Sequence, residues 1–465
     1  MSILLTHGYF IAEDPKEAQI MKPYPPLGIL YISAFLKQNG FECDVFDSTF
    51  SSRETLEQKL LSEKPSIVAI YVNLVTKVNV IKLMKFIRSQ QSLSDTKIVL
   101  GGPDVTYNTK NYLNAGADFV VIGEGEQTML EVVEHLKNGS HQKEEISGIA
   151  YLESGKEIKT KSRVKMKDLA ELPWPDRKAI DLTKYIDVWK HHHGQSTVSV
   201  STQRGCPYTC KWCSTAVYGQ SYRRRPAADV VKELKWLKDN YNPDNIWFVD
   251  DVFTVSHKWL DEFCELMIAA NLHLKFECIT RAERLTEDVL AKLKKAGCFR
   301  IWIGAESGSQ RIIDAMDRRV DVNVVRSMIR KTKQHGIETG TFIMVGYPGE
   351  DESDITETIK HLEESDPDHF TITLSYPIRG TDLFNEVASK ITTTGDWETT
   401  PDRALDFERT QNTRYYHHAI RRVTNQVWFK KSVKQNGVLA ASSLKFGLKS
   451  NFAHLGMKLE KLRGK

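Results

Sequence analysis

Short apolar runs alternate with amphipathic stretches over the first third of the chain. The expected strands are Ile3–Leu5, Glu42–Asp47, Ile67–Tyr71, Lys97–Leu100 and Phe119–Ile122, of which Ile67–Tyr71 is typical of a buried strand. The stretches with apolar residues at helical spacing between them are Leu27–Asn39, Arg53–Glu63 and Val78–Gln90. Strands that alternate with helices favour a parallel, doubly wound sheet. We therefore predict an α/β domain over residues 1–145.

A second series of strand and helix patterns follows residue 194. Its expected strands are Ser196–Ser201, Asn245–Asp251, Leu274–Ile279, Phe299–Gly304, Thr339–Val345 and Phe370–Leu374. Its expected helices are Ala228–Tyr241, His257–Ala270, one that ends at Gly297, Val322–His335 and Ser353–Glu364. Six such units predict a partial (β/α)6 barrel over residues 194–390, with its chemistry at the carboxyl ends of the strands.

Residues 146–193 have a short, mixed pattern and are predicted to be a linker. Ile149–Ile158 is typical of a hairpin that turns at Ser154 and Gly155. Leu172–Asp176, with two prolines, is a rigid connector. We expect His191–His193 to be a solvated loop and not a metal site, because adjacent side chains do not converge.

Residues 391–465 lie outside the repeat and are predicted to be helical. From Lys430 onward the chain contains many lysines and arginines but a single acidic residue, Glu460. Leucines recur there at near-helical spacing. One interpretation is a peripheral membrane-surface helix that brings a lipid or acidic substrate. The other is a solvated helical cap on the barrel.

Composition narrows the class of protein. A length of 465 residues predicts two or three domains, and 41% hydrophobic with 27% charged residues is ordinary for a soluble protein. The net charge of +4 gives no argument for nucleic acid. Neither a signal peptide at Met1–His7 nor an apolar run of about 18 residues is expected. Seven cysteines indicate a reducing compartment, so we expect a cytoplasmic protein.

Three cysteines stand out because they fall within eight residues. Cys206, Cys210 and Cys213 have the spacing C-x3-C-x2-C, too tight for comfortable disulfides among themselves. Three thiolates aimed at one point form a soft ligand set that suits an iron-sulfur cluster and leaves one iron open. A structural zinc site needs a fourth ligand, and no nearby cysteine or histidine follows. Zinc and a chance triplet of core cysteines remain the alternatives.

The residues around these cysteines carry a resemblance. With Arg204 and Gly205 before the motif and Trp212 before its last cysteine, the stretch resembles the radical S-adenosylmethionine (SAM) superfamily. The resemblance implies a 4Fe-4S cluster whose open iron chelates the amino and carboxylate groups of SAM. An electron from the cluster then cleaves SAM to methionine and a 5'-deoxyadenosyl radical.

Polar residues at the ends of the expected barrel strands look like the SAM-contacting segments of that superfamily. By resemblance, Arg281 pairs with the SAM carboxylate, and Glu306, followed by Ser307, takes its ammonium or ribose. The Gly346–Gly349 turn, which includes Pro348, offers backbone to adenine. The alternative for Arg281 and Glu306 is a salt bridge that closes the barrel mouth.

Three glycine-containing turns precede the cysteine motif and resemble the cobalamin-binding domain of one radical SAM subfamily. The resemblance implies that a corrinoid is bound by Gly28, Gly101, Gly102, Gly123, Glu124 and Gly125 in a Rossmann-like domain. Two departures matter. The D-x-H-x-x-G signature is absent near Asp47, which implies a corrinoid without a histidine ligand, and Asp104 stands where relatives often have histidine. The alternative is a regulatory domain that no longer binds corrinoid.

The remaining cysteines limit the reaction class. Cys264, Cys278 and Cys298 fit apolar core faces, and Cys43 alone precedes the motif, so neither auxiliary clusters nor a methylthiotransferase cluster is expected. The resemblance then implies a cobalamin-dependent radical SAM methylase that acts on an unactivated centre of a small molecule or lipid. An electron donor such as flavodoxin or ferredoxin is implied. The alternatives are an anaerobic cyclase, like the magnesium-protoporphyrin monomethyl ester cyclase, and a non-catalytic corrinoid-binding sensor.

Overall fold

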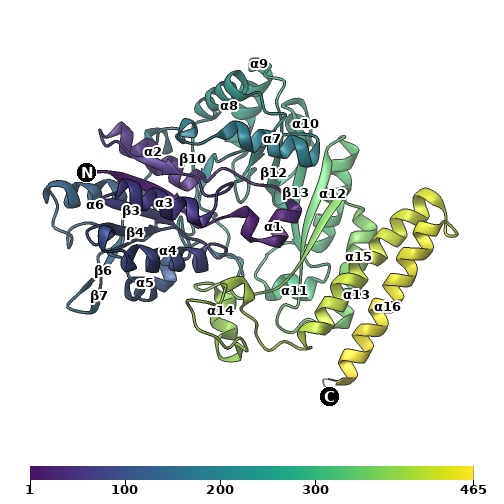
Figure 1. Ribbon diagram of the computed structural model, residues 1–465. Coiled ribbons are helices and arrows are strands. Elements are labelled where there is room, and N and C mark those ends of the chain that lie inside the picture. The colour runs from purple at the N-terminus through teal and green to yellow at the C-terminus, as the bar shows by residue number, and fades with distance from the viewer. Residues whose placement is uncertain (464–465) are drawn as a thin grey trace. The chain divides into compact units, whose positions relative to one another are not determined.

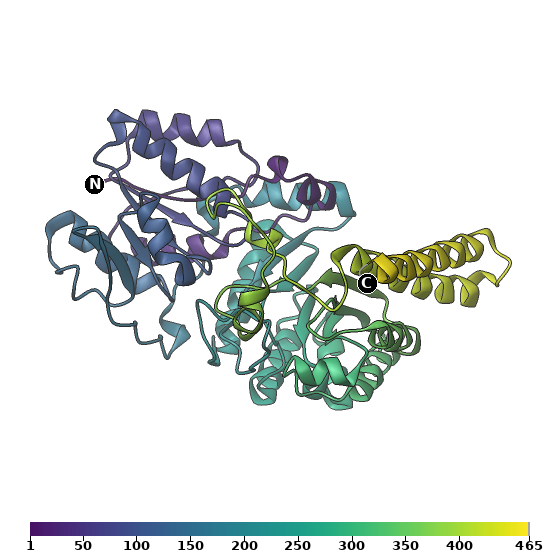
Figure 2. The same ribbon diagram turned by 90° about the horizontal axis from the view of Figure 1, so that it is seen from below.

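The computed structural model describes residues 1–463 and divides into two compact units (Figures 1 and 2). The first unit combines Met1–Pro207 with Ser214–Ile246 and the short segment Thr394–Ala404. The second unit combines Tyr208–Cys213 with Trp247–Thr393 and the chain from Leu405 onward. Neither unit is therefore one continuous stretch of sequence.

The first unit contains a seven-stranded sheet in the order β2-β1-β3-β4-β5-β6-β7. Its strands are β1 Ile3–His7, β2 Asp44–Phe46, β3 Ile67–Tyr71, β4 Lys97–Gly101, β5 Phe119–Val121, β6 Ile149–Glu153 and β7 Lys156–Lys159. The first five are parallel, which confirms the doubly wound sheet. The expected hairpin forms as β6 and β7, but it adds antiparallel strands to this sheet, so it is no free linker.

Both faces of this sheet are buried. Val68 and Ile98 belong to one apolar cluster, while their neighbours Ile67 and Val99 belong to the other. This split follows from the alternation of side chains along a strand and explains the unbroken apolar runs in the sequence. The helices of the unit are α1 Pro15–Ile20, α2 Leu27–Gln38, α3 Arg53–Glu63, α4 Lys77–Ser89, α5 Val105–Asn114, α6 Glu126–Asn138, α7 Leu182–His193 and α8 Ala227–Tyr241.

A second sheet has the order β15-β14-β13-β12-β11-β8 and is the predicted partial barrel. Its strands are β8 Thr197–Val200, β11 Asn245–Phe248, β12 Lys275–Thr280, β13 Cys298–Glu306, β14 Glu338–Val345 and β15 His369–Leu374. From β12 to β15 all pairs are parallel, and the register shifts between Gly304 and Glu306. A separate short ladder pairs β9 Gln203–Arg204 with β10 Arg223–Arg224.

The helices of the second unit follow its strands and end in a long hairpin. They are α9 His257–Ala270, α10 Glu287–Lys295, α11 Gln310–Ala315, α12 Val322–Gln334, α13 Glu352–Ser365, α14 Asp382–Val387, α15 Thr413–Asn436 and α16 Ala441–Arg463. Figure 1 shows α15 between α13 and α16. A side chain at Gly456 would meet the His418 ring at 2.4 Å, so α15 and α16 approach closely there. Over residues 1–463, no helix combines the length and the apolar content that a membrane crossing requires.

Candidate functional site

None of the three cysteines of the motif forms a disulfide in the described part of the chain, and Cys206 is buried, Cys210 half-buried and Cys213 exposed. Within residues 1–463, no three histidine, cysteine or acidic side chains surround a position for a single metal ion. The assignment of the three thiols as cluster ligands stays a prediction. A four-iron cluster takes each thiolate on a separate iron, whereas a mononuclear zinc site takes all its ligands on one ion.

The loop that carries Cys210 and Cys213 is held by its own unit. The Lys211 backbone N–H donates to the Met316 carbonyl at 3.1 Å, and the Thr209 hydroxyl donates to Asp317 at 2.7 Å. Trp212 packs against the apolar cluster that contains Met316. These contacts fix the loop by backbone hydrogen bonds and packing.

Arg281 lies beside this loop, at the end of β12, and is buried. Its Nη1 lies 3.5 Å from the Cys210 Sγ, and its guanidinium lies 4.0 Å from the centre of the Tyr208 ring. The same group pairs with Glu283 and donates to the Arg318 carbonyl. Burial raises the pKa of the Cys210 thiol, and Arg281 opposes that rise because its charge favours the thiolate.

Glu306 ends β13 with a φ of 66° and is half-buried. Among residues 1–463 no group donates a hydrogen bond to its carboxylate, and the alternative salt bridge with Arg281 is not formed, since Arg281 pairs with Glu283. Burial raises the pKa of Glu306 to about 7, and the charge of Arg281 partly offsets this rise. The carboxylate is therefore available to a ligand cation or hydroxyl.

Two other predicted SAM contacts are already occupied by the protein. The Ser307 hydroxyl is buried and accepts the Ser309 N–H at 3.2 Å. The Gly346 N–H donates to the Glu350 carboxylate, and the Gly346 carbonyl accepts from Arg409 at 3.1 Å. These hydrogen bonds shape the turns at the strand ends, and a contact of Ser307 or Gly346 with SAM stays a prediction. Pro348, in the same turn, is half-buried and remains a candidate.

The glycines predicted to meet a corrinoid lie around the carboxyl ends of β4 and β5 and at the start of α2, which holds Gly28. Gly102 has a φ of 114°, and a side chain there would approach the Val72 carbonyl to 2.3 Å, so only glycine fits. At Gly101 and Gly123 an added Cβ meets no described atom closer than 3.8 Å. The backbone at these two positions is open to close approach by a flat ligand.

The Gly123–Glu126 turn is tied to the strand that leads into the cysteine motif. Within the first unit, Arg204 forms an ion pair with Glu126, and Arg223 forms one with Glu124. The Arg204 guanidinium also lies 5.1 Å from the centre of the Tyr218 ring. The Glu124 carboxylate is therefore used internally, and a contact from Glu124 to corrinoid would come from its backbone.

Asp104, the departure from the subfamily pattern, belongs to a buried ionic cluster. The Tyr112 hydroxyl donates to Asp104, and the Lys77 ammonium donates to Asp402 at 2.5 Å. Burial and the neighbouring Asp402 carboxylate raise the pKa of Asp104. Asp402 belongs to the Thr394–Ala404 segment, so this cluster fixes that segment to the first unit.

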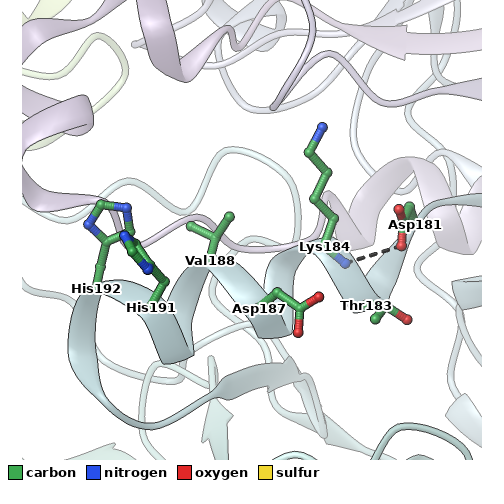
Figure 3. Close-up of a pocket in the computed structure, with 7 residues that line it drawn as sticks. All are labelled: Asp181, Thr183, Lys184, Asp187, Val188, His191 and His192. Carbon is green, nitrogen blue, oxygen red and sulfur yellow. Dashed lines mark hydrogen bonds between the residues drawn. The ribbon is translucent and has the colours of Figure 1, made fainter.

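A surface pocket along α7 is separate from all these residues. It is lined by Asp181, Thr183, Lys184, Asp187, Val188, His191 and His192, all on α7 or its N-cap (Figure 3). The expectation of a loop at His191–His193 was wrong, because the helix continues to His193 and ends at Gly194 with a φ of 72°. None of the predicted site residues lines this pocket.

Sequence reasoning missed four residues that shape the site in the second unit: Tyr208, Arg318, Glu350 and Arg409. Tyr208 lies inside the cysteine motif and Glu350 ends the Gly346–Glu350 turn, so position alone would have drawn notice to both. Arg318 and Arg409 carry no local signal, because their partners Gly304 and Gly346 are 14 and 63 residues away.

Two family models match the chain in the order that the fold suggests. Residues 18–133 match the B12 binding domain, and residues 200–362 match the radical SAM superfamily. This chain has an N-terminal B12-binding domain followed by a radical SAM domain. The open glycine turns of the first unit fall inside the first match, and the three cysteines, Arg281 and Glu306 fall inside the second.

Curated relatives and solved structures agree with this architecture. The chain is 28% identical to an uncharacterized methyltransferase of Pyrococcus horikoshii, over 80% of this chain and 81% of the relative. It is 27% identical to the anaerobic magnesium-protoporphyrin IX monomethyl ester cyclase of Rubrivivax gelatinosus, over 80% and 68%. The radical SAM methyltransferase TsrM from Kitasatospora setae, solved with cobalamin and a 4Fe-4S cluster, superposes with a TM-score of 0.74 at 16% identity, covering 98% of this chain and 99% of TsrM. The chain therefore shares its fold with TsrM.

Proposed function

We propose that this radical SAM enzyme is a cobalamin-dependent methyltransferase that methylates an unactivated carbon or phosphorus centre of a small molecule or lipid. The observation that carries the proposal is the presence, in one chain, of a three-cysteine radical SAM loop and a B12-binding domain with open glycine turns. The similarity to a methyltransferase over four-fifths of both chains supports the same reaction class.

The residues present fit the cofactors that this reaction needs. Cys206, Cys210 and Cys213, which form no disulfide among the described residues, would hold three irons of a 4Fe-4S cluster. The unpaired Glu306 carboxylate suits the ammonium or ribose of SAM. The open backbone at Gly101 and Gly123 suits a corrinoid. When bound, the cluster would supply the electron that cleaves SAM to methionine and a 5'-deoxyadenosyl radical, and the corrinoid would supply the methyl group for transfer.

The chain's own groups prepare the charges at this site. Arg281 places a fixed positive charge 3.5 Å from the Cys210 sulfur, which favours the thiolate that an iron ligand requires. Its remaining contacts, to Glu283 and the Arg318 carbonyl, hold the guanidinium in place. A carboxylate of SAM at this position would meet that charge, while Glu306 would accept the ammonium.

Methyl-labelled SAM tests the proposal directly. The protein would be reconstituted anaerobically with iron, sulfide, hydroxocobalamin and a reductant, then supplied with separate small-molecule and lipid extracts of its source cells. We expect 5'-deoxyadenosine together with label in one extract. The Cys210→Ala variant should lose both, because it lacks one iron ligand. An intact cluster with no cleavage of SAM would contradict the proposal and favour a corrinoid-binding sensor.

A second candidate is an anaerobic oxidative cyclase, favoured by the 27% identity to the magnesium-protoporphyrin IX monomethyl ester cyclase over 80% of this chain. The same incubation separates the two reactions. A cyclase would release 5'-deoxyadenosine and leave the substrate without label, whereas a methyltransferase transfers the label. Either reaction would use an external one-electron donor of the flavodoxin or ferredoxin class.

A further inference from the structure

The outer helix of the C-terminal hairpin, α16, leaves a row of apolar side chains uncovered. Six of them are between 48% and 70% exposed: Leu444, Leu448, Phe452, Leu455, Leu459 and Leu462. Their spacing of three and four residues places them on one arc of the helix, roughly 80° wide at 3.6 residues per turn. The opposite face packs on α15 through small residues such as Ser450 and Ala453. The exposed row is therefore not part of the hairpin's own core.

Cations border this row on both sides. On the helix surface Lys445 and Lys449 follow one edge, and Lys458 and Lys461 follow the other. Within residues 1–463, Lys445, Lys449 and Lys458 form no ion pair, and Lys461 pairs with Glu352 of α13 at 3.5 Å. The one acid of the helix, Glu460, is buried and paired with Arg463. The exposed face thus offers apolar and positively charged groups and no negative charge.

The hairpin as a whole concentrates the positive charge of the chain. Residues 413–463 contain eleven lysines and arginines and one acid, a net charge of +10. Because the entire chain carries +4, the remaining residues carry −6. An even distribution of charge would not produce this contrast. The hairpin would therefore be attracted to an anionic surface that repels the rest of the protein.

We propose that α16 docks in the plane of an anionic lipid surface, with the Leu444–Leu462 row inserted and the flanking lysines on the headgroups. A flat lipid surface can contact the apolar row and both cationic borders at once. The aliphatic stems of the lysines let their ammonium groups reach the lipid headgroups while the apolar side chains are inserted. A second copy of this chain fits worse, because an antiparallel or parallel pair of α16 helices would place cations opposite cations with no acid to balance them. This surface goes beyond the proposed reaction and does not depend on it.

Vesicle flotation with the full-length protein tests the surface. Vesicles of phosphatidylcholine alone would be compared with vesicles that contain about one-third phosphatidylserine, at low and high salt. We expect binding to the anionic vesicles, weakened by salt. The triple variant Leu448→Ser, Phe452→Ser and Leu455→Ser should bind at least about tenfold more weakly, because it removes the inserted side chains.

Charge variants separate this surface from a general effect of net charge. Replacing Lys445, Lys449 and Lys458 with glutamine should weaken binding on the order of 100-fold, since each lysine near an anionic surface contributes about fivefold. Replacing the exposed Lys156, Lys161 and Lys167 of the first unit with glutamine makes the same change in net charge and should leave binding unchanged. Circular dichroism and melting temperature would show that all variants fold.

Three results would overturn the proposal. Equal losses in the two lysine variants would indicate an unspecific charge effect. Unchanged vesicle binding in the serine variant, together with loss of a dimer in sedimentation, would assign the row to a second copy. Binding of the protein to polyglutamate but to no vesicle would indicate that the exposed row and its lysines bind an acidic protein.

Discussion

Glu350 is a buried carboxylate in the turn that follows β14. One of its oxygens accepts the Gly346 N–H, and the other, Oε1, has no hydrogen-bond donor among residues 1–463. Burial raises its pKa from the usual 4.5 to about 8. The folded state therefore holds a proton that the unfolded state releases above pH 4.5. The contribution of this group to stability is full below that pH and is lost as the pH rises to about 8, by roughly 1 kcal/mol per pH unit.

Replacing Glu350 with glutamine removes this titration and keeps an acceptor for the Gly346 N–H. We expect the native protein to be the more stable of the two near pH 5 and to lose that advantage steadily toward pH 8. Urea unfolding of both proteins at four pH values would measure the difference. A difference that stays constant across the range would show that Glu350 is ionised in the folded state.

His361 on α13 is expected to change the stability of the protein with pH in the direction opposite to that of Glu350. Its ring is buried, neither nitrogen has a hydrogen-bond partner among residues 1–463, and burial lowers its pKa to about 3. The unfolded chain takes up a proton near pH 6.5, so stability is full above that pH and falls as the pH drops toward 3. His361→Leu should lose less stability than the native protein between pH 7 and 5. Urea midpoints at these two pH values give the comparison, and equal losses would contradict the assignment.

At the scale of elements, the Thr394–Ala404 segment is held by one buried ion pair, Lys77–Asp402, and by two more exposed pairs, Lys85–Glu398 and Arg403–Asp14. Lys77 on α4 bonds to Asp402 at 2.5 Å and lies 5.2 Å from the centre of the Trp397 ring. Lys77→Met leaves Asp402 and its neighbour Asp104 buried without a cation. We expect a loss of about 3–5 kcal/mol of stability and rapid proteolysis within the segment.

Lys85→Met provides the matched control. Lys85 also lies on α4 and pairs with Glu398 of the same segment, but its side chain is 57% exposed. A surface pair of this kind contributes about 1 kcal/mol or less, so proteolysis should hardly change. If both variants released the segment equally, the buried cluster would not be what holds it.

Local sequence patterns predicted most helices and strands well, but they did not predict which distant residues pair with one another. The helix expected at His257–Ala270 has those bounds in the structure, because its apolar spacing and its Ser256 N-cap are both local signals. The three histidines His191–His193 give no helical signal by themselves, so the helix over them was not predicted. Tyr185, Ile186 and Trp189, just before them, do have helical spacing. Tyrosine and tryptophan at that spacing were the stronger signal.

Partners distant in sequence left no trace in those patterns. The pairing of Lys77 with Asp402 spans 325 residues, and that of Arg204 with Glu126 spans 78. The candidate site shows the same limit. Spacing predicted the three cysteines, and the resemblance predicted Arg281 and Glu306. Only the structure shows that Ser307 and Gly346 are already hydrogen-bonded.

At the scale of the molecule, the core of the first unit extends past residue 145, where we placed the end of the first domain. Five apolar side chains beyond that point are at most 7% exposed and belong to one of its two core clusters: Ile146, Ile149, Tyr151, Leu169 and Leu172. At about 1.5–3 kcal/mol for each buried side chain, they contribute on the order of 10 kcal/mol. That is comparable with the whole stability of a typical domain, about 5–15 kcal/mol.

Two fragments test where the first domain ends. We expect residues 1–145 to lack a cooperative thermal transition, because β5 loses its partner β6 and one face of the sheet loses much of its cover. Residues 1–172 keep the β6–β7 hairpin and both leucines, so this fragment should melt cooperatively and bind hydroxocobalamin more tightly. Melting curves by circular dichroism and the absorbance of bound corrinoid give both readings. A cooperative transition of residues 1–145 at the same temperature as that of residues 1–172 would place the boundary at 145 and make the hairpin an accessory to a domain that is complete without it.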